Sequence, residues 1–330
     1  IYQSVPVAIT VEGANILTRS MIIFGQGAIR CHPWLLKEMT AATSEAADAR
    51  EEFDRALFGH FGYSISNGVR SLALGLTGGR LSRAPVSGPV ARHYRRINRL
   101  TANFTLIADT TLLMLGGKFK FAEKLSGRFA DALSHLYFAS ATLKRFEDDG
   151  RPEADLPLVE WAVSDSLHRV EEALHGVLAN FPSGAVGGVL KRICFPFGRV
   201  HAESGDRTGH KLAKILMSRN ATRDRLTHDV FRPTSGVGTA VALDAFEAVL
   251  AAEEAERTLV NGLKRQPTPV NVEQLTAEGV EAGLINQEQA ELLIEAQRLS
   301  AELIAVDEFD AEALSHAQFG EAESPLAEAS

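Results

Sequence analysis

Apolar residues recur at helical spacing along most of the chain. Between Phe119 and Asp148, for example, they return every three or four residues, as on one face of an α-helix. Almost no segment alternates with period two, and only the short apolar run at residues 5–11 is predicted to be extended. We therefore predict an all-α fold, with helices over residues 35–58, 63–76, 90–115, 119–148, 158–181, 237–263, 272–282 and 287–306.

Proline and glycine residues divide this helical pattern. Pro33 disfavours helix at the preceding His32, so a first helix is expected to end there. A loop rich in proline and glycine at residues 85–89 and the pair Pro267 and Pro269 mark two further boundaries. The predicted domains are residues 1–82, a second helical bundle at 83–266, a helical hairpin at 267–310, and an acidic tail at 311–330 that is expected to be disordered.

Local signals predict finer details of these helices. Gly59 and Gly62 are expected to end the helix that starts at residue 35. Asn286, with Gln289 three residues later, has the spacing of a capping box. Trp161 is predicted to point inward from its helix. In the predicted helix at residues 63–76, four apolar residues fall on one face: Ile65, Val69, Leu72 and Leu76.

Composition limits the class of protein. The 330 residues are 45% hydrophobic and 23% charged, as in an ordinary globular protein able to bury a core. Two cysteines, Cys31 and Cys194, make no disulfide framework, which favours a reducing compartment such as the cytoplasm. No secretory signal precedes the pattern at Ile1, and the chain begins without methionine, so we expect a fragment.

Several kinds of site lack their sequence signatures. The ten histidines show no metal-binding spacing, so no metal site is predicted, and no phosphate-binding loop or nucleophile elbow occurs. Basic pairs lack an accompanying nucleic-acid-binding motif, so no nucleic-acid partner is expected. The best candidate for a membrane span, from Phe104 to Gly117, is too short and contains Asp109, which favours a buried helix.

Charge is segregated within a net charge of −8. Residues 80–130 hold ten Lys and Arg against two Asp and Glu, whereas residues 240–330 hold four against nineteen. The basic segment could attract a CoA phosphate group, an anionic membrane surface or the acidic tail of the same chain. An internal or solvated surface role is favoured over the first two.

One carboxylate stands at a turn between the extended run and a helical pattern. Glu12 and Gly13 follow the apolar residues 5–11, and Ile16 and Leu17 begin the helical spacing. One interpretation is that Glu12 complements the helix dipole. The other is that Glu12 is a general base, because apolar neighbours remove water from the carboxylate and raise its pKa.

The segment Val11-Glu12-Gly13 with Leu17 and Arg19 resembles the catalytic segment of acyl-CoA dehydrogenases. Residues 12–310 are similar to the extra helical C-terminal region of the large bacterial members that act in fatty-acid β-oxidation. The resemblance implies that residues 1–82 end the family's C-terminal helical domain and that further helices follow. Two residues depart from the family pattern: Ala14 replaces the usual threonine, and Val11 replaces a frequent tyrosine.

The resemblance also implies a reaction. Fatty acyl-CoA thioesters would be oxidised to trans-2-enoyl-CoA, with Glu12 removing the α-proton and FAD accepting hydride. Gly13 and Asn15 would contact the FAD, while Arg19 would form either a structural salt bridge or a flavin contact. Electron-transfer flavoprotein as acceptor, a homodimer, and peripheral contact with the inner membrane are further implied. Because most of the flavin site is expected upstream, the fragment alone is predicted to be inactive.

A non-catalytic role is the alternative. The chain would then be a helical module for oligomerisation, electron-carrier docking or membrane-surface attachment. The segments expected to carry the attachment are basic and apolar at residues 185–200 and basic at residues 208–228.

Overall fold

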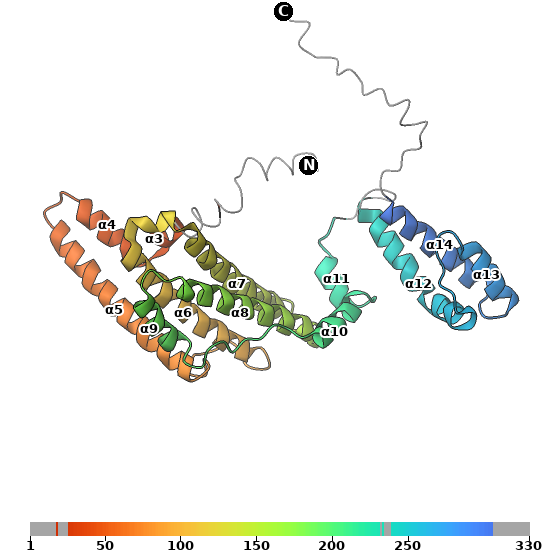
Figure 1. The fold of residues 1–330 in the computed structure, drawn as a ribbon, viewed down its shortest axis with the longest axis horizontal. Coiled ribbons are helices and arrows are strands. Elements are labelled where there is room, and N and C mark those ends of the chain that lie inside the picture. Colours follow the sequence, from red (N-terminus) through yellow and green to blue (C-terminus); the bar gives the residue numbers. More distant parts are fainter. Residues whose placement is uncertain (1–17, 19–25, 232, 234–238, 306–330) are drawn as a thin grey trace, which may run out of the picture. The chain divides into compact units, whose positions relative to one another are not determined.

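The computed structural model describes residues 18, 26–231, 233 and 239–305, and the described residues form helices without any strand. This confirms the predicted all-α fold. The chain divides into two compact units, residues 1–217 and 218–330 (Figure 1). The predicted domain boundaries at residues 82, 266 and 310 stay predictions. No described helix combines the length and the apolar character that crossing a membrane requires.

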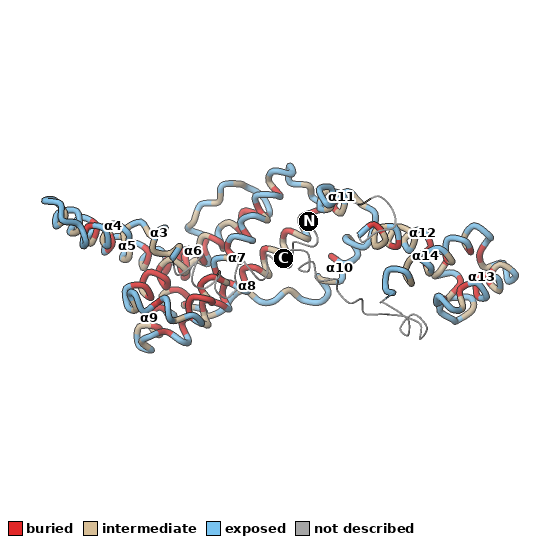
Figure 2. The backbone as a smooth tube through the Cα atoms, turned by 90° about the horizontal axis from the view of Figure 1, so that it is seen from above, coloured by how far each residue is buried: buried red, intermediate tan, exposed pale blue. Residues whose placement is uncertain are grey.

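The first unit is built around three long helices. These are α6 (Ala91–Leu115), α7 (Glu123–Asp148) and α8 (Leu156–Ala179). In Figure 2, buried positions recur along α6, α7 and α8 and alternate with exposed ones, as expected for helices that bury one face. The other described elements of this unit are α3 (Gly27–Cys31), α4 (Leu35–Thr43), the long helix α5 (Ala49–Leu76), η3 (Gly116–Phe121), η4 (Glu153–Asp155), α9 (Gly184–Cys194) and α10 (Asp206–Leu216).

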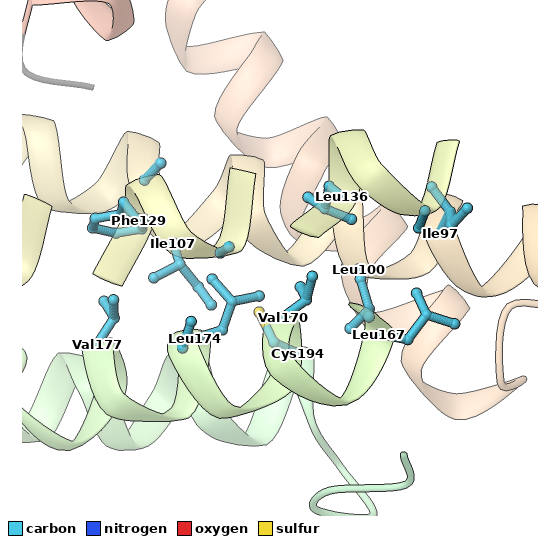
Figure 3. Close-up of a cluster of buried hydrophobic side chains, with 14 of the residues drawn as sticks. Ile97, Leu100, Ile107, Phe129, Leu136, Leu167, Val170, Leu174, Val177 and Cys194 are labelled. Atoms are coloured by element: carbon cyan, nitrogen blue, oxygen red, sulfur yellow. The ribbon is translucent and has the colours of Figure 1, made fainter. Parts of the chain in front are cut away.

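The apolar core of this unit lies between α6, α7 and α8. In Figure 3, Leu167, Val170, Leu174 and Val177 of α8 point toward Ile107 and Phe129 of the neighbouring helices. Each of these six side chains is 0% exposed, as close packing in a protein interior requires. Cys194, at the end of α9, is also fully buried in this cluster.

Helix α5 corrects two predictions. The chain leaves the helix at Ser44, whose hydroxyl accepts a hydrogen bond from the Ala46 backbone N–H, so residues 35–58 are not one helix. Gly59 and Gly62 were predicted to end a helix, but α5 runs through both. A Cβ at Gly59 would lie 2.6 Å from the Trp34 ring, so this glycine permits close packing and does not break the helix.

Periodicity placed apolar residues on common faces but not always on buried ones. Ile65, Val69, Leu72 and Leu76 of α5 are 40–68% exposed, so their shared face lies on the surface of the first unit. Trp161 was predicted to point inward, and this is wrong, because its side chain is 39% exposed. The spacing of apolar residues defines a face, whereas the neighbouring helices decide whether that face is covered.

The second unit packs a helical hairpin against one long helix. Its helices are α11 (Ala221–Thr227), α12 (Thr239–Leu263), α13 (Val272–Glu281) and α14 (Gln287–Ile304). Leu259, Leu275 and Leu293 meet in its core, each at most 1% exposed. The predicted capping box is confirmed: Asn286 Oδ1 accepts from Gln289 N at 2.8 Å, and Gln289 Oε1 accepts from Asn286 N at 2.9 Å.

Candidate functional site

The residues predicted to carry catalysis and cofactor binding precede the described part of the first unit. Glu12, Gly13 and Asn15, and also Arg19, lie outside the described residues. Continuous description starts at residue 26, immediately before α3. Helix α3 ends at Cys31, as the effect of Pro33 on its neighbour predicted.

A buried polar network begins where α3 ends. His60 of α5 is 4% exposed and Asp109 of α6 is 2% exposed. His60 Nε2 lies 2.7 Å from Asp109 Oδ1, and His60 Nδ1 lies 2.8 Å from Glu38 Oε1 on α4. The Ser64 hydroxyl also donates to Asp109. Four helical turns from α4, α5 and α6 are thereby tied together by charged or polar groups inside the protein.

His32 connects the loop after α3 to this network. Its Nδ1 accepts hydrogen bonds from the backbone N–H groups of Leu35 at 3.0 Å and Trp34 at 3.3 Å. An accepting nitrogen carries no proton, so the ring proton lies on Nε2. This Nε2 faces Asp109 Oδ1 at 3.3 Å. His32 therefore accepts hydrogen bonds from the backbone N–H groups at the start of α4. The same side chain contacts the buried Asp109 carboxylate.

The network shifts the pKa values of its members in opposite directions. Burial alone would lower the pKa of His60, but hydrogen bonds and charge interactions with Asp109 and Glu38 outweigh burial and raise it. Burial alone would raise the pKa of Asp109, but the contacts with His32, His60 and Ser64 outweigh it and lower the pKa. Both shifts favour an ionised pair.

The same side chains have the composition of a metal site. Ligand atoms of His32, His60 and Asp109 lie within 4.8 Å of one another. Metal binding needs a free lone pair on each histidine nitrogen. Here His32 Nε2 carries the ring proton, and both nitrogens of His60 face carboxylates, which only accept hydrogen bonds. The polar groups of His60, Asp109 and Glu38 therefore pair with one another in a hydrogen-bonded ion network, which leaves no lone pair on His60 for a metal ion.

A largely apolar cavity of about 410 Å³ opens beside the network. Ala28, Phe104, Leu112 and Leu133 form apolar parts of its wall. His32, Asp109 and Tyr63 supply the polar part of its lining. Such a pocket, mostly apolar with a few convergent polar groups, is typical of small-molecule sites. It lies next to the end of α3, directly after the segment that contains Glu12 in sequence.

Residues 29–309 match the family described as acyl-CoA dehydrogenase, C-terminal, bacterial type. The chain belongs to this family. No solved structure shows a significant match to it. Membership implies an acyl-CoA dehydrogenase type of function within an oxidoreductase family whose members generally bind FAD.

The family match and the buried network cover the same part of the chain. His32, His60 and Asp109 lie inside the matched residues of this acyl-CoA dehydrogenase C-terminal domain, whereas Glu12, Gly13 and Asn15 precede them. In the sequence, Asp109 stands out only as the charge within an apolar run, and no local pattern indicates its partners. His60 is 49 residues from Asp109 in sequence, so no local spacing could have joined them.

A second buried carboxylate fixes the segment after α9 of the acyl-CoA dehydrogenase domain. Glu171 of α8 is 0% exposed and accepts hydrogen bonds from the backbone N–H groups of Val200 and His201, both at 2.9 Å. Burial raises the pKa of Glu171, and the two N–H donors and Arg99 oppose that rise. Arg99 Nη2 lies 3.6 Å from the carboxylate. This network attaches a loop to the bundle and borders no cavity named above.

Proposed function

We propose that the chain is the C-terminal part of an FAD-dependent acyl-CoA dehydrogenase of fatty-acid β-oxidation. Its reaction would convert fatty acyl-CoA thioesters into trans-2-enoyl-CoA. The observation that supports this most strongly is the family match from residue 29 onward, directly after the segment with Glu12, Gly13 and Arg19. The match and the segment are independent features of one continuous sequence.

Glu12 is the proposed base for the α-proton of the thioester. The flanking run at residues 5–11 and the helical positions Ile16 and Leu17 are apolar. An acyl chain bound among such residues removes water from the carboxylate, and loss of hydration favours a pKa closer to the working pH. Removal of the α-proton places negative charge on the thioester oxygen, which the backbone N–H of Glu12 would stabilise.

Gly13 and Asn15 are the residues proposed to hold FAD within this segment. Gly13 has no Cβ, so the backbone can approach a ligand closely. The Asn15 amide offers both donors and an acceptor, whereas Ala14 lacks the hydroxyl that the family's threonine provides. FAD, when bound, supplies the acceptor for the β-hydrogen as hydride. Most FAD contacts belong to segments outside this chain in the proposal.

The described helices hold the loop after α3, which follows the proposed catalytic segment in sequence. The loop after α3 is bound to the bundle core through His32 and Asp109, whose contact is 3.3 Å. A residue placed on rigid elements keeps its position better than one on an unsupported loop. The proposal further includes a homodimer located in the cytoplasm. Its substrate is fatty acyl-CoA, and its electron acceptor is electron-transfer flavoprotein.

The test is Glu12→Gln in the full-length enzyme, with Glu51→Gln as control. Glu51 is an exposed glutamate that pairs with Arg55 along α5. Loss of a general base should lower kcat by about 10²–10⁴-fold or more, with the flavin absorption spectrum unchanged. The control should retain full turnover. Substantial dehydrogenation by Glu12→Gln would show that another residue is the base.

A second candidate is attachment to an anionic membrane surface. Val189 is 55% exposed and Phe197 is 69% exposed, and Lys191 and Arg192 lie between them in sequence. Apolar side chains beside cations are typical of interfacial segments. Co-sedimentation with phosphatidylglycerol vesicles at low salt tests this role, and no binding under those conditions would reject it.

A further inference from the structure

An open pocket lined by arginines lies between the end of α5 and the start of α6. Its volume is about 830 Å³, within the range typical of small-ligand sites. Arg80 follows α5, and Arg92, Arg95 and Arg96 lie in the first two turns of α6. The remaining lining residues are Leu76, Thr77, Gly78 and Leu81. The pocket therefore presents four guanidinium groups and no carboxylate in its lining.

The helix dipole makes Arg92 unfavourable in the first turn of α6, and Arg95 and Arg96 add positive charge in the second turn. The N-terminus of a helix carries a partial positive charge, so acidic residues are favoured there and basic residues are not. The first turn of α6 has no acidic residue, and Arg92 lies in it. Arg80 can interact favourably with the C-terminal end of α5, whereas Arg92 adds positive charge to the positive end of the α6 dipole. An anion would compensate both the side chains and the helix end.

Neighbouring acidic groups compensate little of this charge. Arg92 pairs with Glu160 at the edge of the pocket. Arg80, Arg95 and Arg96 form no ion pair within the described part of the chain. Burial lowers the pKa of Arg96, and repulsion by Arg92 and Arg99 lowers it further. His93, which is buried next to Arg92 in sequence, has its pKa lowered to about 4 by burial and by the charges of Arg92 and Arg96.

The walls of the pocket are held in place without a ligand. Gly79 has φ +83°, and a Cβ there would lie 2.6 Å from the Arg95 carbonyl oxygen, so the loop after α5 rests directly on α6. The Asn98 amide donates to the Arg83 carbonyl oxygen at 3.0 Å, and the Ser82 hydroxyl reaches the Arg95 carbonyl at 3.4 Å. A site with fixed walls loses little entropy when it binds.

We propose that the pocket of Arg80, Arg92, Arg95 and Arg96 binds the phosphate or diphosphate group of a soluble phosphorylated molecule. Guanidinium groups match phosphate oxygens because each can donate two parallel hydrogen bonds. The volume accommodates a diphosphate together with part of an attached group. The pocket shares no lining residue with the cavity beside Asp109, and the proposed phosphate binding does not require the proposed dehydrogenation.

The experiment measures binding of inorganic pyrophosphate and of free CoA by isothermal titration calorimetry at low salt. The protein is used as the full chain, either wild type or carrying Arg95→Gln and Arg96→Gln. Saturable binding with one site is expected for wild type. The double variant should bind at least tenfold more weakly, and added salt should weaken wild-type binding because the site is exposed to solvent. Binding of both probes, or of pyrophosphate alone, supports the site.

A control variant separates the pocket from general charge. Arg55→Gln with Arg145→Gln removes the same charge from exposed arginines of the same unit, each paired along its own helix, and should leave the affinity within twofold of wild type. Equal weakening by both double variants would overturn the proposal. If neither pyrophosphate nor CoA bound saturably, the proposal would also be overturned, including the case where only phosphatidylglycerol vesicles bind. The thermal unfolding midpoint of the pocket variant should not fall, since repulsion is relieved, whereas a structural role for the arginines would lower it.

Discussion

Asp109→Asn tests whether the buried network is an ion network. Asp109 is 2% exposed and faces the side chains of His60, His32 and Ser64. The amide is nearly the same size but carries no charge, so the His60 cation keeps only Glu38 as a counter-ion. Breaking a buried pair by neutralising one partner costs about 3–5 kcal/mol. We expect the free energy of unfolding of the first unit to fall by that amount.

The matched control is Asp148→Asn. Asp148 pairs with Lys144 along α7, and its side chain is 59% exposed. An exposed pair four residues apart is worth only about 0.3–0.5 kcal/mol. Urea unfolding followed by tryptophan fluorescence reports the first unit alone, because both tryptophans, Trp34 and Trp161, belong to it. If Asp109→Asn cost no more than Asp148→Asn, the buried network would not be ionic.

The pH dependence follows from the directions of the two pKa shifts. Since folding raises the pKa of His60, its stabilisation is complete below 6.5 and is lost as pH rises through the folded-state value. Since folding lowers the pKa of Asp109, its stabilisation is complete above 3.8 and is lost as pH falls through the folded-state value. The cost of Asp109→Asn should therefore be largest between pH 3.8 and 6.5 and should shrink on the alkaline side.

The remaining predictions concern packing and thiol chemistry. Gly59→Ala should lower the thermal midpoint and change the emission of Trp34, whose ring lies 2.6 Å from the added Cβ. On the same helix, the Cβ added by Gly62→Ala meets nothing within 4 Å. This second change should stabilise the folded protein by about 0.4–1 kcal/mol. Equal effects of the two changes would contradict the packing argument. Cys31 is exposed, while burial raises the pKa of the Cys194 thiol to about 12. A thiol reagent at pH 8 should label Cys31 rapidly and Cys194 only in denaturant; rapid double labelling of the native protein would refute the burial of Cys194.

Helical periodicity predicted where most helices lie, because the apolar residues of a helix gather on one face and therefore recur every three or four residues. Residues 90–115 were predicted to be helical, and α6 spans Ala91–Leu115. The same periodicity could not say which faces are covered, since that depends on contacts between distant segments. The exposed apolar face of α5 and the exposed Trp161 of α8 show this limit.

The role of a glycine also depends on tertiary packing. Gly59 and Gly62 look alike in sequence, and both suggested the end of a helix. In the structure Trp34 packs onto Gly59, while the space beside Gly62 is open. The tryptophan reaches Gly59 only because α4 folds back along α5. No window of sequence around the two glycines contains that information.

The buried network was missed because it also joins residues that are distant in sequence. Burying its charged groups has a cost in free energy. Transferring Asp109 and His60 out of water is unfavourable, and apolar side chains of similar size would often stabilise a core at least as well. The rest of the first unit already has fully buried apolar side chains such as Leu100, Phe129 and Leu167.

What an ion network adds is a geometric requirement, because its hydrogen bonds form in only one arrangement of the helices. His32 brings the loop after α3 into that arrangement: its Nδ1 accepts from the first backbone groups of α4, and its Nε2 faces Asp109 of α6. The network thus fixes the loop between α3 and α4 against α6 in this acyl-CoA dehydrogenase domain.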